Sequence, residues 1–170
     1  MNHFHFREID STNSWLKQNL SRIPEGGIVW VTADTQTMGR GRHGRSWASP
    51  AGEGLWMTYG YWSPGDVEAP LSLGIAEKIV GVLHGIGLQC TVKPPNDILV
   101  NGKKLCGILC ETVWEGDKAA HVIGIGINVR SSPQGLDQPV TSLWEEGVML
   151  EVGELFKLIQ NEIKNNILTK

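Results

Sequence analysis

The chain has 170 residues, 41% of them hydrophobic, which is enough for one domain with its own core. Its formal net charge of -3 argues against a general nucleic-acid binder, because such a protein usually carries positive charge over a whole face. The three cysteines form no disulfide or zinc framework, and the sequence shows neither a secretory signal nor an apolar run of about 18 residues, so we expect a cytoplasmic protein without a membrane partner.

Strand-like and helix-like patterns alternate along the chain, which predicts a mixed α/β layout. An extended start through residues 3–9 leads into residues 10–13, whose short polar side chains are typical helix caps. We therefore expect a first helix near residues 12–21. Strands are expected at residues 28–33 and 55–62, because both segments are rich in β-branched and aromatic residues.

The loop between those two strands, residues 39–47, reads Gly-Arg-Gly-Arg-His-Gly-Arg-Ser-Trp. Glycine lets the backbone approach a ligand closely, and guanidinium groups donate hydrogen bonds to phosphate or carboxylate oxygens. No acidic residue occurs from Thr35 to Gly52, so no neighbour in the sequence neutralises these arginines. The loop predicts an anion-binding site, with a solvated surface loop as the alternative.

Apolar residues at helical spacing predict two core-facing helices, at residues 70–86 and 152–167. A strand is expected between them at residues 119–130, where isoleucines alternate with smaller residues in the run Gly-Ile-Gly-Ile-Asn at 124–128. Glycine inside a strand often marks a close approach of a ligand or of another segment. This face is expected either to form the floor of a binding surface or to pack tightly against a helix.

A hairpin is expected around Asn-Gly at residues 101–102, because both residues readily adopt positive φ. In that register Leu99 lies opposite Lys104, and Asp97 lies opposite Cys106. Side chains alternate between the two faces of a strand. Asp97 and Lys104 are therefore expected on the same face as diagonal neighbours, roughly 7–8 Å apart.

Taken together, these segments resemble the catalytic domain of biotin protein ligases. The resemblance covers most of the chain, fades after Asn128, and rests on motifs that occur in the family's order and approximate spacing. These are Ser11-Thr12-Asn13, the loop at 39–47, Lys93-x-Pro95-Asn96-Asp97, Lys104-Leu105-x-Gly107-Ile108-Leu109-x-Glu111 and Gly124-x-Gly126-Ile127-Asn128.

The resemblance implies an α/β (α+β) fold of the class II aminoacyl-tRNA synthetase and biotin ligase type, with a mixed, mostly antiparallel sheet backed by helices. It also implies one catalytic domain over residues 1–170, with no N-terminal helix-turn-helix domain and without the C-terminal SH3-like barrel. Oligomeric state is left open, and a homodimer is compatible with the resemblance.

The activity implied is that of an ATP-dependent ligase working in two steps. The biotin carboxylate attacks the α-phosphorus of ATP to form biotinyl-5′-adenylate. A lysine of a biotin carboxyl carrier domain, belonging to acetyl-CoA carboxylase or a related carboxylase, then displaces AMP. The small-molecule requirements are ATP, Mg²⁺ and biotin, and no nucleic acid is expected.

The resemblance also implies roles for individual residues. Lys104, with Arg42 and Lys93, is expected to stabilise charge on the reacting carboxylate and phosphate, and Asp97 to help hold Mg²⁺. The residues expected to bind biotin are Ser11, Thr12, Asn13, Gln36, Gly39, Arg40, Lys104, Gly107 and Gly124. The residues expected to bind ATP are Arg40, Arg42, Arg45, Trp47, Lys93, Asn96, Asp97 and Asn128.

Two other functions fit parts of the pattern. A lipoate- or octanoate-transferring enzyme of the same superfamily would attach a different acid to a similar lysine, but its usual Arg-x-x-Gly-Gly-Gly motif is missing. A non-catalytic anion- or RNA-binding module would use the arginine loop as an electrostatic clamp. Its binding would weaken steeply with salt and would not depend on biotin.

Overall fold

A computed structural model describes residues 2–65 and 72–167. Its elements, in chain order, are β1 (Asn2–Ile9), α1 (Thr12–Gln18), η1 (Leu20–Arg22), β2 (Val29–Gln36), η2 (Arg42–Gly44), β3 (Gly54–Pro64), α2 (Ser72–Gly85), β4 (Thr91–Lys93), β5 (Asp97–Val100), β6 (Lys103–Glu115), β7 (Lys118–Asn128) and α3 (Val152–Ile167).

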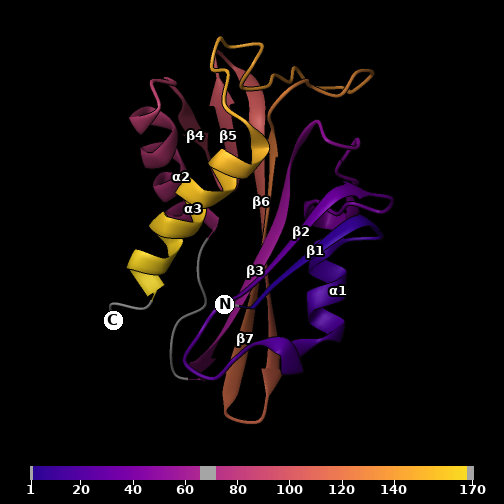
Figure 1. Cartoon of the computed structure of the whole chain (residues 1–170), viewed down its shortest axis with the longest axis vertical. Coiled ribbons are helices and arrows are strands. Elements are labelled where there is room, and N and C mark those ends of the chain that lie inside the picture. The colour runs from indigo at the N-terminus through magenta and orange to yellow at the C-terminus, as the bar shows by residue number, and fades with distance from the viewer. Residues whose placement is uncertain (1, 66–71, 168–170) are drawn as a thin grey trace.

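One seven-stranded sheet, in the order β1-β2-β3-β7-β6-β5-β4, runs through the molecule. Helices α2 and α3 lie on one side of the sheet and α1 on the other (Figure 1). Only β1 and β2 pair in parallel, and every other neighbouring pair is antiparallel. The expected mixed, mostly antiparallel sheet backed by helices is confirmed. Among the described residues, no helix has the length and apolar character needed to span a membrane.

The sheet separates two hydrophobic cores, because successive side chains of a strand point to opposite faces. The larger core packs beneath α2 and α3 and includes Ile123, Ile125 and Ile127 of β7. The smaller core packs beneath α1 and includes Ala120 and Val122 of the same strand. The alternation predicted for this strand is therefore present in the structure.

The face of β7 beneath α1 changes character along the strand. After Ala120 and Val122, the residues on this face are Gly124, Gly126 and Asn128. Glycine has no side chain with which to continue an apolar core. The smaller core therefore ends near Val122, and the rest of this face is left for segments that approach from elsewhere in the chain.

Helix α1 begins where the capping residues predict. Ser11 is its N-cap, and the Ser11 hydroxyl oxygen accepts a hydrogen bond from the backbone N–H of Ser14 at 3.4 Å. The helix ends at Gln18, earlier than expected, because Asn19 leaves the helical region at φ -128° and ψ 42°. The separate turn η1 follows it.

The two long helices agree with the periodicity of their apolar residues. Helix α2 is described from Ser72 to Gly85, while the first residues of the predicted segment, 70–71, lie outside the described part of the chain. Helix α3 matches its predicted span and buries Leu155, Ile159 and Ile163 against the sheet.

The turn between β5 and β6 has the predicted geometry. Asn101 and Gly102 both adopt positive φ, 49° and 78°. Leu99 pairs with Lys104 as expected. The short-range chemistry of Asn-Gly therefore sets this part of the register correctly.

The predicted register is wrong one step further from the turn. Asp97 pairs with Gly107 rather than with Cys106, because a bulge shifts the register where Leu105 has no partner on β5. The side chains of Leu105 and Cys106 are both fully buried. The extra residue thus lets two consecutive side chains of β6 enter the interior, which a regular hairpin would not allow.

Candidate active site

A cavity of about 590 Å³ lies over the glycine-rich end of β7, within the range of about 300–1,000 Å³ that is typical of small-molecule sites. Its walls come from segments far apart in the sequence, which include the start of α1, the loop at 39–47, and strands β5, β6 and β7. All the residues predicted for the site line it: Ser11, Thr12, Asn13, Gln36, Gly39, Arg40, Arg42, Arg45, Trp47, Lys93, Asn96, Asp97, Lys104, Gly107, Gly124 and Asn128. The ligand that each contacts stays a prediction.

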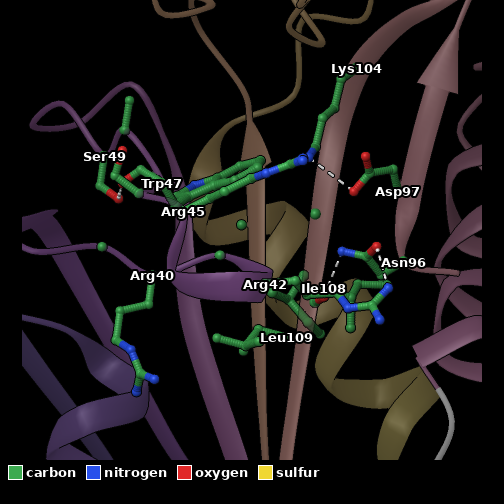
Figure 2. A pocket seen from close by; sticks show the side chains of 18 of the residues that line it. Arg40, Arg42, Arg45, Trp47, Ser49, Asn96, Asp97, Lys104, Ile108 and Leu109 are labelled. Atoms are coloured by element: carbon green, nitrogen blue, oxygen red, sulfur yellow. Dashed lines mark hydrogen bonds and ion pairs between the residues drawn. The ribbon is translucent and has the colours of Figure 1, made fainter. Parts of the chain in front are cut away.

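Lys104 and Asp97 form an ion pair inside this cavity. The Lys104 Nζ atom lies 2.9 Å from Asp97 Oδ1, and the two side chains are only 15% and 16% exposed. The same ammonium lies 5.2 Å from the centre of the Trp47 ring. The prediction that the hairpin brings this acid and this base together is confirmed, and Figure 2 shows Lys104 reaching across to Asp97 beside Trp47.

The Trp47 ring covers two glycines of the sheet. A Cβ atom at Gly107 would lie 2.7 Å from the ring, and a Cβ atom at Gly126 would lie closer still. Both distances are too short for real Cβ contacts, so only glycine at these positions allows the ring to lie here. The glycines on β6 and β7 therefore make the seat for an aromatic wall of the cavity.

Two buried polar atoms that line the cavity have no partner in the described part of the protein. They are Trp47 Nε1 and Asn128 Oδ1. The nearby Asp97 Oδ1 atom has the Lys104 ammonium as its partner. Because buried polar groups are normally hydrogen-bonded, a cluster of this kind at one cavity indicates a place for a polar ligand.

Three further cations surround this end of the cavity. Arg42 donates a hydrogen bond from Nη1 to Asn96 Oδ1 at 3.3 Å. Within residues 2–65 and 72–167, neither Arg42, Arg45 nor Lys93 forms an ion pair with a carboxylate. The positive charge of these side chains is therefore available to an anion in the cavity.

A closed ionic cluster around Glu111 adjoins the opposite end of the cavity, where Asn13 and Arg40 line the wall. Glu111 Oε1 accepts from Lys17 Nζ at 2.8 Å and lies 3.2 Å from Arg40 Nη2. Glu111 Oε2 accepts from Asn13 Nδ2 at 3.1 Å and from Arg40 Nη1 at 3.4 Å. In Figure 2 the Arg40 side chain points away from Lys104, so this arginine is separated from the other cations.

The surroundings of Glu111 favour its charged form. Burial raises the pKa of this carboxyl, but hydrogen bonds from Lys17 and Asn13, together with the charges of Lys17 and Arg40, outweigh burial and hold the pKa below its ordinary value. Two cations thus face one carboxylate, and the cluster keeps an excess of positive charge.

A chain of hydrogen bonds extends from this cluster beneath the cavity. Asn13 Oδ1 accepts from the Thr58 hydroxyl at 2.5 Å, and that hydroxyl lies 2.7 Å from Thr12 Oγ1. Gln36 Oε1 accepts from the backbone N–H of Thr12 at 2.9 Å, and Gln36 Nε2 donates to Ser49 Oγ at 2.8 Å. The polar side chains at this end therefore hold one another in place.

Asn13 lies directly over Gly124, where any Cβ atom would overlap the Asn13 amide. Its oxygen accepts from Thr58, and its Nδ2 donates to Glu111 and, at 3.4 Å, to the backbone carbonyl of Leu109. Both alternatives weighed for the glycine face thus apply: β7 is approached closely by the start of a helix, and the same face lines the cavity.

Sequence reasoning missed several residues that shape the site. The sequence motifs include Glu111 without assigning it a role, and they do not include Lys17 or Thr58. Thr58 had a usable signal, because it is a polar residue within an apolar strand. Residues on the segment after β7 also line the cavity: Pro133, Leu136, Gln138 and Val140.

The described residues contain no cluster of three or more His, Cys, Asp or Glu side chains suited to a metal ion. A metal held mainly by the protein is therefore not indicated in this part of the chain. Asp97 offers a single carboxylate, whose Oδ1 atom lies 2.9 Å from Lys104 Nζ. Mg²⁺ commonly uses one or two protein carboxylates together with phosphate and water, so the donor set fits a cation that arrives with a nucleotide.

Comparisons with known proteins agree with this geometry. A family model described as the biotin/lipoate A/B protein ligase family matches residues 5–128. The bifunctional ligase/repressor BirA of Bacillus subtilis is 46% identical over 117 residues, which cover 66% of this chain and 35% of that protein. The chain spans about half or less of the length of the first curated relatives.

Two solved structures are similar over nearly the whole chain. The biotin protein ligase of Leishmania major, in complex with biotinyl-5-AMP, has a TM-score of 0.78 at 28% identity and is matched over 98% of this chain and 74% of its own. The biotin protein ligase of Aquifex aeolicus, in complex with biotin and ATP, has a TM-score of 0.76 at 30% identity, with coverage of 98% and 70%.

Proposed function

The chain belongs to the biotin/lipoate A/B protein ligase family, and from that premise we propose that it is an ATP-dependent biotin protein ligase. It joins biotin to AMP and then transfers biotin to a lysine of a biotin carboxyl carrier domain. The observation that carries this proposal is one cavity with two unlike ends. One end presents unpaired cations and unsatisfied polar atoms, and the other presents an ordered polar network.

The cationic end suits the first chemical step. The biotin carboxylate oxygen bonds to the α-phosphorus while the bond from that phosphorus to pyrophosphate breaks. Negative charge is spread over the oxygens of the reacting groups, and fixed cations stabilise it. Lys104 is held in the cavity by Asp97 and supplies one such charge, while Arg42, Arg45 and Lys93 supply others that no carboxylate neutralises.

The unsatisfied atoms suit a nucleotide. Asn128 Oδ1 is a buried acceptor with no donor, so it favours a base that presents an amino group, as adenine does. Asn128 Nδ2 already donates to the backbone carbonyl of Thr141 at 3.0 Å, which fixes the side-chain orientation. The Trp47 ring offers an aromatic face on the same side of the cavity.

Mg²⁺ is part of the proposal as a companion of ATP. Asp97 would hold it from the protein side, and the ion would supply positive charge against the phosphate oxygens. Within the protein, the carboxylate also orients Lys104 through the ion pair.

The second step requires a protein partner, the biotin carboxyl carrier domain. The carrier lysine, as a neutral amine, bonds to the acyl carbon of the adenylate, AMP leaves, and the amine loses a proton. We propose that residues 1–170 act as one catalytic domain in this step, with a homodimer as a compatible assembly and the cytoplasm as the compartment. The acceptor is the carrier domain of acetyl-CoA carboxylase or a related carboxylase.

Biotin is preferred to lipoate because the far end of the cavity is polar. Thr12, Asn13 and Gln36 form a hydrogen-bonded network there, and biotin carries a ureido group that can use polar partners. The dithiolane ring of lipoate cannot. Packing the apolar dithiolane ring against this network would displace water from its polar groups without giving them new partners, so lipoate should bind less tightly than biotin.

The test is a two-stage assay of the whole chain. The protein is incubated with ATP, Mg²⁺ and biotin, or with lipoate in place of biotin, and the products are identified by mass spectrometry. A biotin carboxyl carrier domain is then added. We expect biotinyl-5′-AMP followed by one biotinylated lysine, with little product from lipoate. Equal use of lipoate would contradict the biotin assignment, and absence of any adenylate would contradict the ligase assignment.

A further inference from the structure

Glu111 lies at the junction of three parts of the chain that are distant in sequence. It is on β6, and it binds Lys17 and Asn13 of α1 as well as Arg40 of the loop at 39–47. Its side chain is 18% exposed, while those of Lys17 and Arg40 are 32% and 42% exposed. Among the three charged side chains of the cluster, the carboxylate is thus the most enclosed.

The contact with Arg40 uses both oxygens of the carboxylate and two nitrogens of the guanidinium. Such a paired contact fixes the plane and the direction of the guanidinium as well as its distance. The backbone of Arg40 forms a bridge with Ser46, and the N–H of Trp47 donates to the carbonyl of Gly39 at 2.8 Å. Holding Arg40 therefore also holds the base of the loop.

The contact with Asn13 restrains the side chains beneath the cavity in the same way. Both amide groups of Asn13 already have partners within the protein, because its oxygen accepts from Thr58 and its nitrogen donates to Glu111 and Leu109. Its role is to order Thr58, which in turn lies beside Thr12. Without Glu111, the Asn13 Nδ2 group would lose its shorter hydrogen bond and keep only the 3.4 Å contact with the Leu109 carbonyl.

We infer that Glu111 is a positioning residue for the acid-binding end of the cavity. Resting on the proposed function, this inference assigns Glu111 to the binding of biotin and not to the binding of ATP. It acts through Arg40 and Asn13 and does not itself touch the ligand. Lys17 binds the same carboxylate. The carboxylate therefore neutralises the charge of Arg40 only in part, while it still fixes the direction of the guanidinium.

The experiment compares dissociation constants for biotin and for ATP with Mg²⁺, measured separately by isothermal titration calorimetry. In Glu111→Gln, loss of the charged contacts should weaken biotin binding roughly tenfold. ATP binding should change less than twofold and the melting temperature by only a few degrees. Lys17→Met should weaken biotin binding by a smaller factor. Glu151→Gln is the matched control, because it removes an arginine–glutamate pair, Arg130 Nη2 to Glu151 Oε2 at 2.6 Å, outside the cavity.

A double-mutant cycle distinguishes positioning from general damage. If Glu111 acts through Arg40, the losses in Glu111→Gln and Arg40→Gln should not add in the double variant. Additive losses, an unchanged biotin constant in Glu111→Gln, or equal weakening of biotin and ATP would each overturn the inference. A wild-type protein that binds biotin but forms no adenylate would refute the proposed function while leaving this binding test intact. A wild-type protein that does not bind biotin would refute both.

Discussion

The two ends of the cavity differ in how far the protein satisfies its own polar groups. Around Glu111, both carboxylate oxygens, both amide atoms of Asn13 and the Thr58 hydroxyl have partners. Around Lys104, the Trp47 indole N–H and the Asn128 oxygen are buried without partners. The first end is complete without a ligand, and the second is completed by one.

This difference explains how one cavity can serve two substrates. A preformed polar network selects the acid by shape and hydrogen bonding at little cost in reorganisation. Buried polar atoms without partners destabilise the empty site, and a nucleotide that pairs with them offsets that cost, while the unpaired cations attract its phosphates. Each end can therefore be damaged separately by substitution.

The largest effect is expected at the incomplete end. Lys104→Ala removes the cation that lies closest to Asp97, and adenylate formation should fall by about 10²–10³-fold, the range found when a preorganised charge-stabilising group is removed. Initial rates of pyrophosphate release measure this loss.

Lys103→Ala is the matched control for Lys104. Lys103 is the neighbouring residue on β6, but its side chain is 50% exposed and pairs with Glu146 at 3.4 Å. Its loss should change the rate less than about twofold, because exposed ion pairs contribute little. Equal losses in the two lysine variants would remove the special role of Lys104.

Alanine substitutions at the two glycines of β7 should destabilise the protein to different extents at the two ends of the cavity. Gly124→Ala forces a methyl group into the buried, fully bonded Asn13 amide, and we expect a loss of about 1–3 kcal/mol in the free energy of unfolding. Gly126→Ala meets Trp47, whose ring is only partly buried and lies on a loop. The loss there should be below about 1 kcal/mol, because a loop side chain can move aside.

Urea titration measures both glycine variants. Ligand binding provides the second readout: Gly124→Ala should weaken biotin, and Gly126→Ala should weaken ATP. Stability losses in the reverse order would contradict the difference drawn between the two ends.

The ionic cluster should give the complete end a pH signature. The folded-state pKa of Glu111 lies below the ordinary 4.5, so its contribution to stability is present above that value and is lost as the pH falls through the folded pKa. The free energy of unfolding of the wild type should exceed that of Glu111→Gln at pH 6 to 7. The gap should narrow below pH 4.5. A gap that does not depend on pH would mean that the charge of Glu111 contributes nothing.

The smallest effect on ligand binding is expected for a substitution outside the cavity, which serves as a control for the other variants. Gly81 lies within α2, and a Cβ atom there would meet nothing within 4 Å. Gly81→Ala should raise the free energy of unfolding by about 0.5–1 kcal/mol and leave both ligands unaffected, because alanine favours the helix without new contacts. A change in biotin or ATP binding would show that the assay reports stability and not the site.

Features set by local chemistry were predicted well from the sequence. The Asn-Gly turn, the cap at Ser11 and the alternation of β7 each depend on neighbouring residues, and all three are present. The bulge at Leu105 was not predicted, because it depends on how two consecutive side chains pack in the core. The end of α1 was placed too late because apolar spacing continues past Asn19.

The site also has a part that the sequence predicts and a part that it does not. Its residues were recognised through motifs, and the Lys104–Asp97 pair followed from a hairpin only a few residues long. The Glu111 cluster joins residues that are 71 to 98 positions apart. No pattern along the chain reports which of several lysines and arginines meets one glutamate after folding, so this network became visible only in three dimensions.

The proposed activity requires one cavity to hold the acid and the nucleotide together. The direct measurement is calorimetric titration of the whole chain with a non-hydrolysable biotinyl-adenylate analogue, compared with biotin alone and AMP alone. Joining the two parts should raise the affinity at least about 100-fold above that of the better fragment, because the second part binds without a further loss of translational freedom. An analogue that binds no more tightly than biotin alone would show that the two ends do not form one site.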